Sequence, residues 1–164
     1  MRKTTLEIMD TTLRDGEQTS GVSFSASEKL TLAKLLLQQL KVDRIEVASA
    51  RVSDGEFNAV KNITSWGKET NFIYSIEVLT FVDGGSSIQW MIDSGAKVQN
   101  LLTKGSLNHL KHQLKQTPEV HFNNIKETIK RAANQGFKTN VYLEDWSNGM
   151  QNSETYVFDY LDFL

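Results

Sequence analysis

Two patterns of apolar residues alternate along this chain. Apolar runs of about four to eight residues suit buried strands, whereas apolar positions that recur every three or four residues suit one face of a helix. The runs predict five strands, at 5–9, 42–48, 72–79, 97–102 and 138–143. The helical spacing predicts helices at 30–40, 54–66, 88–92, 107–114, 120–133 and 157–164.

Local signals mark where some of these helices begin and end. Ser25 is followed three residues later by Glu28, which is the spacing of a capping box, so the first helix is expected to begin beside Ser25. Pro118, the only proline of the chain, suits the first turn of a helix. Gly136 suits the end of that helix.

The repeated strand-helix pattern predicts a parallel sheet with helical crossovers. A doubly wound sheet of five strands fits 164 residues, whereas a TIM-type (βα)8 barrel needs about 250 residues and would be cut off after its fifth unit. Length therefore favours the open sheet. The first strand is followed by neither a G-x-G-x-x-G pattern nor a Walker loop, so dinucleotide and nucleoside triphosphate binding are not expected.

The composition is that of one ordinary globular domain, with 39% hydrophobic and 23% charged residues. Eighteen basic and 20 acidic residues give a net charge of −2, so neither nucleic acid nor a membrane is expected as a partner. The lack of cysteine excludes disulfides and a cysteine nucleophile. The short apolar runs and the absence of a signal-peptide core predict a cytoplasmic protein.

Polar side chains collect at the carboxyl ends of the predicted strands. They are Asp10, Arg14, Asp15, Glu46, Ser49, Glu77, Thr103, Ser106, Glu144 and Asp145. The carboxyl ends of parallel strands share one rim, where ligands bind in such folds. Carboxylates with an arginine suit a divalent cation such as Mg²⁺ or Mn²⁺ and the carboxylate of a substrate. The pattern predicts metal-assisted chemistry on an oxo acid.

Structural interpretations of the same residues stay open. Arg14 and Asp15 could serve only in a turn and an ion pair. Glu46 and Glu144 lie among apolar neighbours, where even a structural carboxylate needs a partner. His109 and His112 have helical spacing but no acidic residue at metal spacing, so a solvated or capping role is favoured.

Several segments go beyond general chemistry. Residues 10–18 read DTTLRDGEQ, which resembles the signature of the acyl-CoA-dependent Claisen synthases, the family of 2-isopropylmalate, homocitrate and citramalate synthases that also contains hydroxymethylglutaryl-CoA lyases. The resemblance continues through 21–25, 43–51, 104–109 and 140–149. Residues 43–51 and 140–149 look most like a citramalate synthase, with isopropylmalate synthase a close second.

The resemblance implies a different fold from the one that length favours. Residues 1–164 would be the N-terminal part of a catalytic (βα)8 barrel, truncated to about its first five βα units. The implied activity is an acyltransferase that condenses acetyl-CoA with a 2-oxo acid, either pyruvate to citramalate or 2-oxoisovalerate to 2-isopropylmalate, in branched-chain amino-acid biosynthesis.

The matching positions imply roles for individual residues. Arg14 would bind the 2-oxo acid and stabilise developing charge, Asp15 would ligate a divalent metal, and Glu144 would be the acid/base residue. The metal would be Mg²⁺ or Mn²⁺, with Zn²⁺ as a further candidate. The remaining implied substrate-binding residues are Gln18, Glu46, Leu79, Leu102 and Tyr142. The last three would line a pocket that suits a methyl group.

Other parts of the family's site are not in this sequence. The H-x-H metal ligands are absent, and the acetyl-CoA site and the groups contributed by a dimer partner would lie beyond residue 164. The fragment is therefore expected to be inactive by itself. Unpaired edge strands and uncovered apolar side chains predict either a homodimer or a piece of a longer chain. The inward apolar positions are expected to be Ile8, Ile45, Ile76, Val98 and Val141, and the helix face of Val157, Tyr160 and Leu161 adds to this surface.

Two alternatives to a synthase remain. One is a carbon–carbon lyase similar to hydroxymethylglutaryl-CoA lyase, although that branch of the family uses a cysteine that this chain lacks. The other is a truncated half-barrel without catalytic activity.

Overall fold

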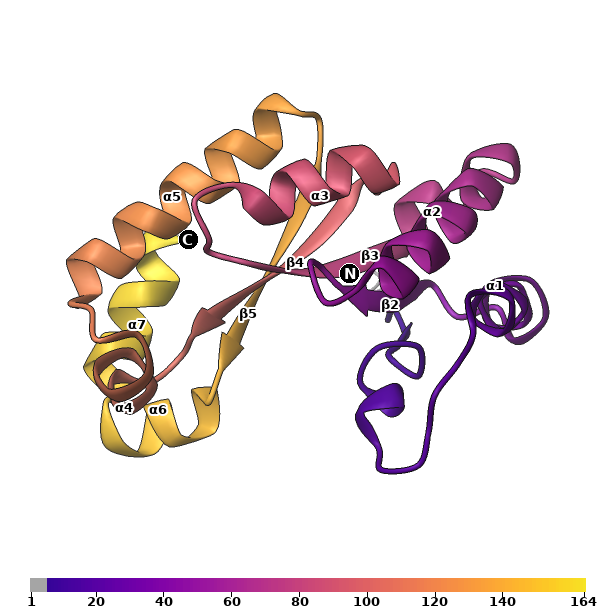
Figure 1. Ribbon diagram of the computed structural model, residues 1–164. Coiled ribbons are helices and arrows are strands. Elements are labelled where there is room, and N and C mark those ends of the chain that lie inside the picture. The colour runs from indigo at the N-terminus through magenta and orange to yellow at the C-terminus, as the bar shows by residue number, and fades with distance from the viewer. Residues whose placement is uncertain (1–5) are drawn as a thin grey trace, which may run out of the picture. The chain divides into compact units, whose positions relative to one another are not determined.

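The computed structural model describes residues 6–164 and contains one five-stranded sheet (Figure 1). Its strands are β1 (Met9–Asp10), β2 (Arg44–Ser49), β3 (Ile76–Phe81), β4 (Val98–Lys104) and β5 (Lys138–Glu144). They lie in the order β1-β2-β3-β4-β5, and β2 pairs in parallel with both β1 and β3. A doubly wound sheet reverses its order part-way, so the fold that length favours is wrong. The chain has the α/β architecture of five consecutive units of a TIM-type (βα)8 barrel.

Helices follow each strand. They are α1 (Ala26–Lys34), α2 (Asp54–Glu69), α3 (Ser86–Ser94), α4 (Leu107–His109), α5 (Pro118–Asn134), α6 (Trp146–Asn152) and α7 (Glu154–Phe163). Helices α1 and α4 continue into the π-helical segments Leu35–Leu40 and Leu110–Leu114. Among the described residues, no helix is both long enough and apolar enough to cross a membrane.

The predicted start signals are confirmed. The Ser25 hydroxyl accepts a hydrogen bond from the Glu28 amide, while the Glu28 carboxylate accepts one from the Ser25 amide, which completes the capping box. Pro118 opens α5, with the Thr117 side chain as its cap. A helix terminus leaves backbone groups without intrahelical partners, so these side chains fix where the helices begin.

Some element boundaries differ from the predictions. The first strand is regular only at Met9–Asp10. Before it, the Ile8 amide donates to the Asp43 carboxylate, and the Ile8 carbonyl accepts from the amides of Asp43 and Arg44. Thr5 of the predicted range lies outside the described residues. A 3₁₀ turn at Ile73–Ser75 delays β3.

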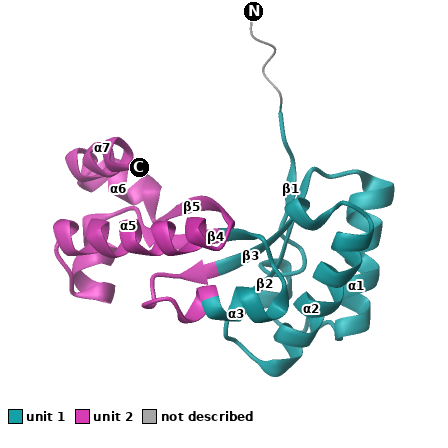
Figure 2. Cartoon of the chain, turned by 90° about the horizontal axis from the view of Figure 1, so that it is seen from above, with its two compact units in different colours: residues 1–79, 89–99 teal, residues 80–88, 100–164 magenta. Residues whose placement is uncertain are grey.

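The chain divides into two compact units (Figure 2). The first unit comprises Met1–Leu79 and Gln89–Gln99, and the second comprises Thr80–Ile88 and Asn100–Leu164. In the first unit, α1 packs on α2, and the buried core includes Leu37, Ile45, Val60 and Ile63.

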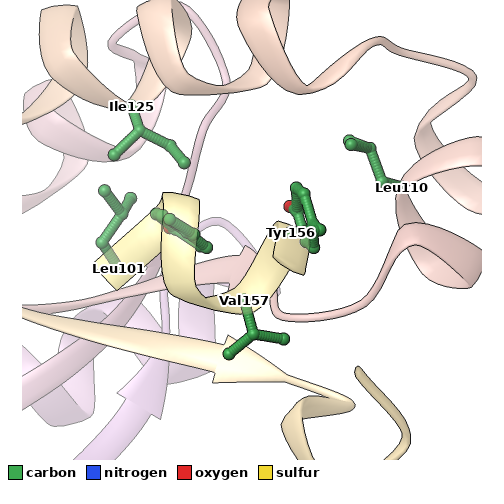
Figure 3. Close-up of a cluster of buried hydrophobic side chains, with 6 residues drawn as sticks. Leu101, Leu110, Ile125, Tyr156 and Val157 are labelled. Carbon is green, nitrogen blue, oxygen red and sulfur yellow. The ribbon is translucent and has the colours of Figure 1, made fainter. Parts of the chain in front are cut away.

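The second unit has its own hydrophobic core (Figure 3). It consists of Leu101, Leu110, Ile125, Tyr156, Val157 and Tyr160. Phe122 of α5 stacks on the rings of Tyr156, Tyr160 and Phe163, with centroids 5.8, 5.0 and 4.9 Å away. Burial of several large rings dominates the packing energy of a small core, so α5 and α7 hold each other in place.

The expected apolar inner face is not observed. Ile45 and Ile76 are fully buried, and a Cβ added at Gly67 of α2 would lie 2.4 Å from Ile76 Cδ1, so this side of the sheet faces the helices. Val98 is buried too, and Val141 packs against the core of the second unit. Side chains alternate across a strand, so the opposite face carries polar residues. In the first unit these are Arg44, Glu46 and Glu77, and in the second they are Asn100 and Asn140.

Candidate functional site

The first unit brings the residues of the 10–18 motif into a tight loop after β1. The amides of Arg14, Asp15 and Gly16 all donate to the carbonyl of Thr11, at 3.1, 2.8 and 3.1 Å. Leu13 is fully buried and anchors the loop to the core. The convergence of three amides on one carbonyl fixes the backbone from which the Arg14 side chain projects.

Arg14 is held by two carboxylates. Its Nε donates to Glu46 Oε2 at 2.5 Å, and its Nη1 donates to Asp15 Oδ1 at 2.9 Å. The Glu46 side chain is completely buried, whereas that of Asp15 is 59% exposed. A buried carboxylate is costly unless an oppositely charged group meets it. Glu46 therefore orients the guanidinium from its buried side, and the Asp15 carboxylate remains accessible to solvent.

A second ion pair lies beside the first. Glu46 and Glu77 are register partners on β2 and β3, and Arg44 Nη1 donates to Glu77 Oε1 at 3.2 Å. The two arginines thus offset two neighbouring buried carboxylates. A pocket of about 340 Å³ adjoins this group. Its lining includes Arg14, Gln18, Ser23, Ser49 and Ser53.

The second unit gathers a different group around Glu144 at the end of β5. Lys104 Nζ donates to Glu144 Oε2. His109 lies between two carboxylates, with Nδ1 4.0 Å from Glu144 Oε2 and Nε2 3.5 Å from Asp145 Oδ2. Hydrogen bonds from Ser106 and Asn148 lower the pKa of Asp145.

The backbone of Lys104 is fixed on both sides. Its amide donates to Nε2 of His121 at 3.2 Å, and its carbonyl accepts from the Tyr156 hydroxyl at 2.6 Å. His121 is buried, and burial, aided by the charge of Lys104, lowers its pKa to about 4. The neutral imidazole can thus accept a hydrogen bond from the Lys104 amide, which fixes the backbone of the residue whose side chain contacts Glu144.

The predicted pocket residues lie in both units. Leu79 is a buried residue of the first unit. In the second unit, Leu102 lines a cavity of about 220 Å³ together with Phe81, Val82 and Leu114. Tyr142 is half-buried on β5. The structure brings Arg14, Asp15, Glu46 and Gln18 together in one unit; the meeting of this group with Glu144 on one rim stays a prediction.

The residues of this chain do not by themselves fit a metal centre. Asp15 could offer one oxygen ligand, but no three histidine, cysteine, aspartate or glutamate side chains gather at metal-binding distance within residues 6–164. His112 is exposed. The side chain of His109 is 23% exposed and lies near Glu144 and Asp145, two neighbours that its sequence spacing did not indicate. Ser106 caps α4, where its hydroxyl accepts a hydrogen bond from the His109 amide at 3.2 Å.

Sequence reasoning missed several charged residues of these groups. Lys29, Arg44 and Lys104 each contact a carboxylate that is distant in sequence. Their spacing carries no signal, because lysine and arginine are ordinarily surface residues. For Arg44 the buried carboxylate of Glu77 was the available clue, since it requires a cation nearby.

Comparisons with known proteins identify relatives of this chain. The HMGL-like family model matches residues 5–158. An (R)-citramalate synthase from Methanocaldococcus jannaschii is 34% identical over 140 residues, which cover 85% of this chain and 27% of that protein. A 2-isopropylmalate synthase from Sulfolobus acidocaldarius is 35% identical over 140 residues, which cover 85% of this chain and 35% of that protein. A homocitrate synthase from Methanopyrus kandleri is 35% identical over 138 residues, which cover 84% of this chain and 33% of that protein. The chain thus spans about a third or less of the length of these relatives.

Proposed function

This chain belongs to the HMGL-like family, and we propose that it is the N-terminal part of an enzyme that condenses acetyl-CoA with a 2-oxo acid. The observation that carries the proposal is the clamped guanidinium of Arg14, held by the buried Glu46 beside a pocket. Relatives named as citramalate, 2-isopropylmalate and homocitrate synthases support it.

Arg14 is suited to an oxyanion that develops at a carbonyl. A guanidinium has five N–H donors, and Glu46 and Asp15 each engage one of those on Arg14, so others are left to reach a ligand. Donors that are already oriented cost no reorganisation when charge develops on the substrate oxygen. Arg14 would therefore bind the oxo acid and stabilise the alkoxide that forms on carbon–carbon bond formation.

Glu144 is the candidate acid/base residue. Its side chain is 40% exposed, so a reacting group can approach it, while Lys104 holds one of its oxygens. A carboxylate in this position would take a proton from the methyl group of acetyl-CoA or return one to the alkoxide. Lys104 would position the carboxylate for either transfer.

Asp15 would contribute one oxygen to a divalent cation, which, when bound, polarises the oxo group as a Lewis acid. The residues of this chain supply too few ligands for that ion, so its other ligands would have to come from outside residues 6–164. The roles proposed for Arg14 and Glu144 do not depend on it.

The side chains matched to the substrate pocket favour a small 2-oxo acid. Leu79, Leu102 and Tyr142 are bulky, which suits the methyl group of pyruvate better than the isopropyl group of 2-oxoisovalerate. Each methylene-sized difference in such a pocket is worth about 1–3 kcal/mol. We therefore propose pyruvate, and a citramalate synthase reaction, ahead of 2-isopropylmalate synthesis.

Thiol release from acetyl-CoA tests the proposal, using pyruvate or 2-oxoisovalerate and a polypeptide of measured intact mass. A source polypeptide longer than this chain is expected to release thiol faster with pyruvate. Arg14→Lys keeps a charge beside Glu46 but loses the forked donors, so kcat should fall about 10²- to 10³-fold. His112→Gln, at an exposed position, should leave kcat unchanged.

The 164-residue chain by itself is expected to release no thiol. Two results would contradict the proposal: a longer source polypeptide that releases no thiol with either acid, or full activity in its Arg14→Lys variant. Turnover by the 164-residue chain would show that the site is complete without further residues.

A further inference from the structure

Lys29 is a buried lysine with an unusual set of partners. It lies on α1 and is 1% exposed. Its Nζ lies 2.6 Å from Glu17 Oε2 and 2.6 Å from Glu56 Oε1. The same atom donates to the carbonyls of Leu13, at 3.0 Å, and Val47, at 3.3 Å. The ammonium group therefore links the 10–18 loop, β2 and α2.

Burial of an ammonium group carries a large desolvation cost, which only close oppositely charged and hydrogen-bonding partners offset. An apolar residue could fill the same space without that cost. The positions of the partners indicate why a charged residue is used here. Leu13 and Glu17, which both contact the ammonium group, lie on either side of Arg14 and Asp15 in the chain. A contact to both ends of this short segment restrains the segment itself.

We propose that Lys29 is a positioning residue that holds the Leu13–Glu17 segment against β2 and thereby places Arg14 for its substrate. This inference rests on the proposed function for the role of Arg14, although the restraint itself is independent of any reaction. Glu46 fixes the guanidinium end of Arg14, while Lys29 contacts the Leu13 backbone carbonyl on one side of it and the Glu17 side chain on the other. Together they leave the side chain little freedom.

The two carboxylates that meet Lys29 provide a matched pair of variants. Both lie 2.6 Å from Nζ, and their side chains have similar exposure, 20% for Glu17 and 17% for Glu56. They differ in location, because Glu17 is part of the loop whereas Glu56 is on α2. Glu17→Gln also keeps an oxygen that can accept from the Phe24 amide, as Glu17 Oε1 does at 2.8 Å.

The test is hydrogen exchange measured by NMR on the 164-residue chain. The probes are the amides of Arg14, Asp15 and Gly16, which donate to Thr11, and the Arg14 Nε–H, which donates to Glu46. Loss of one charge-assisted contact should speed exchange at these probes about tenfold in Glu17→Gln. Glu56→Gln should stay within about twofold of the unchanged protein, because Glu17 and the Leu13 carbonyl still hold the loop.

Amides within α1 and α2 serve as the internal reference, and they should exchange at similar rates in both variants. Equal acceleration at the loop probes in Glu17→Gln and Glu56→Gln would mean that Lys29 is simply a core cation, and would overturn the proposal. No acceleration in Glu17→Gln would overturn it too. Because no turnover is measured, a failure of the proposed condensation activity would leave this result intact.

Discussion

Glu46 shows how one buried charge organises its surroundings. Its carboxylate has no exposed side-chain surface, and Arg14 supplies the neutralising cation at 2.5 Å. Pairs of this kind are costly to break, because the remaining partner keeps its desolvation cost without the attraction. The same contact that aims Arg14 at the pocket therefore also contributes to the stability of the first unit.

We expect Arg14→Met to destabilise the first unit by about 3 kcal/mol, because it leaves Glu46 buried without its guanidinium. Urea unfolding monitored at resonances of the first unit measures the change. The double variant Arg14→Met/Glu46→Gln should recover part of the loss, since it removes both charges. A single variant as stable as the unchanged protein would show that Glu46 has a sufficient cation elsewhere.

Residues of the candidate site differ in how far sequence could place them. Arg14, Asp15 and Gln18 belong to one contiguous motif, so their proximity follows from the chain itself. Glu46 could be singled out because a carboxylate among apolar neighbours needs a partner. His109 could not, because Glu144 and Asp145 come 35 and 36 residues later and reach it only through the pairing of β4 with β5.

At the scale of elements, α5 carries a buried histidine whose protonation destabilises the folded protein. His121 is buried with its Nε2 accepting the Lys104 amide, and burial lowers its pKa from 6.5 to about 4. The folded protein thus binds this proton more weakly than the unfolded chain does. The contribution of His121 to stability is complete above about pH 6.5 and is lost as the pH falls toward 4.

This titration predicts a loss of up to about 3 kcal/mol between pH 6.5 and 4, since each pKa unit is worth about 1.4 kcal/mol. Urea unfolding at several pH values measures the loss. His121→Gln keeps an acceptor for the Lys104 amide but cannot titrate, so its stability should depend less steeply on pH. The same slope in both proteins would contradict the prediction; His112→Gln, at an exposed site, serves as the control.

Elements were predicted well where a repeated pattern covers several turns, and less well where tertiary contacts decide. The final helix was predicted from the apolar stripe of Val157, Tyr160, Leu161 and Leu164. The period is confirmed but the buried face is rotated, because Tyr156 is buried and Leu161 is exposed. Helix α6 was missed: its sequence contains Gly149, a poor helix former. A Cβ at Gly149 would lie 2.0 Å from the Gly105 carbonyl oxygen, so packing requires the glycine.

At the scale of the whole molecule, chain length was a misleading guide and strand order was decisive. A length of 164 residues suits a complete doubly wound sheet, but the observed order β1-β2-β3-β4-β5 is that of consecutive barrel units. Strand and helix spacing is the same in both folds, so periodicity could not separate them. The nine-residue motif did, because it identified a family whose fold is a barrel.

Metal affinity should be low in a chain that offers so few ligands. A divalent cation that dehydrates reluctantly gains little from one carboxylate, and Asp15 is already engaged by Arg14. We expect the 164-residue chain to bind Mg²⁺ or Mn²⁺ with a Kd weaker than about 1 mM, measured by calorimetry. Asp15→Asn is the matched variant. Micromolar affinity that disappears in Asp15→Asn would show that ligands we have not identified complete the site.

Exposed apolar side chains give a separate reason to expect self-association. Most of the apolar positions proposed from sequence cannot drive it, because they are buried: Ile45, Ile76, Val98, Val157 and Tyr160. Ile8 and Leu161 are exposed, at 57% and 46%. Helix α7 and its C-cap Leu164 expose apolar side chains at Phe158, Leu161 and Leu164, which recur every three residues and are each about half exposed. Residues with this spacing share one side of a helix. An exposed apolar side of a helix can mark a contact between proteins.

We therefore expect the 164-residue chain to form a two-fold homodimer through this side of α7, because an isologous contact would cover the exposed side chains of both copies at once. Sedimentation equilibrium at tens of micromolar should give twice the 18.6 kDa chain mass. Leu161→Lys places a charge in the contact and should shift the equilibrium to monomer. Leu40→Lys, at an exposed leucine of the first unit, should not. A monomer at high micromolar concentration, or a dimer that survives Leu161→Lys, would exclude α7 as the contact surface.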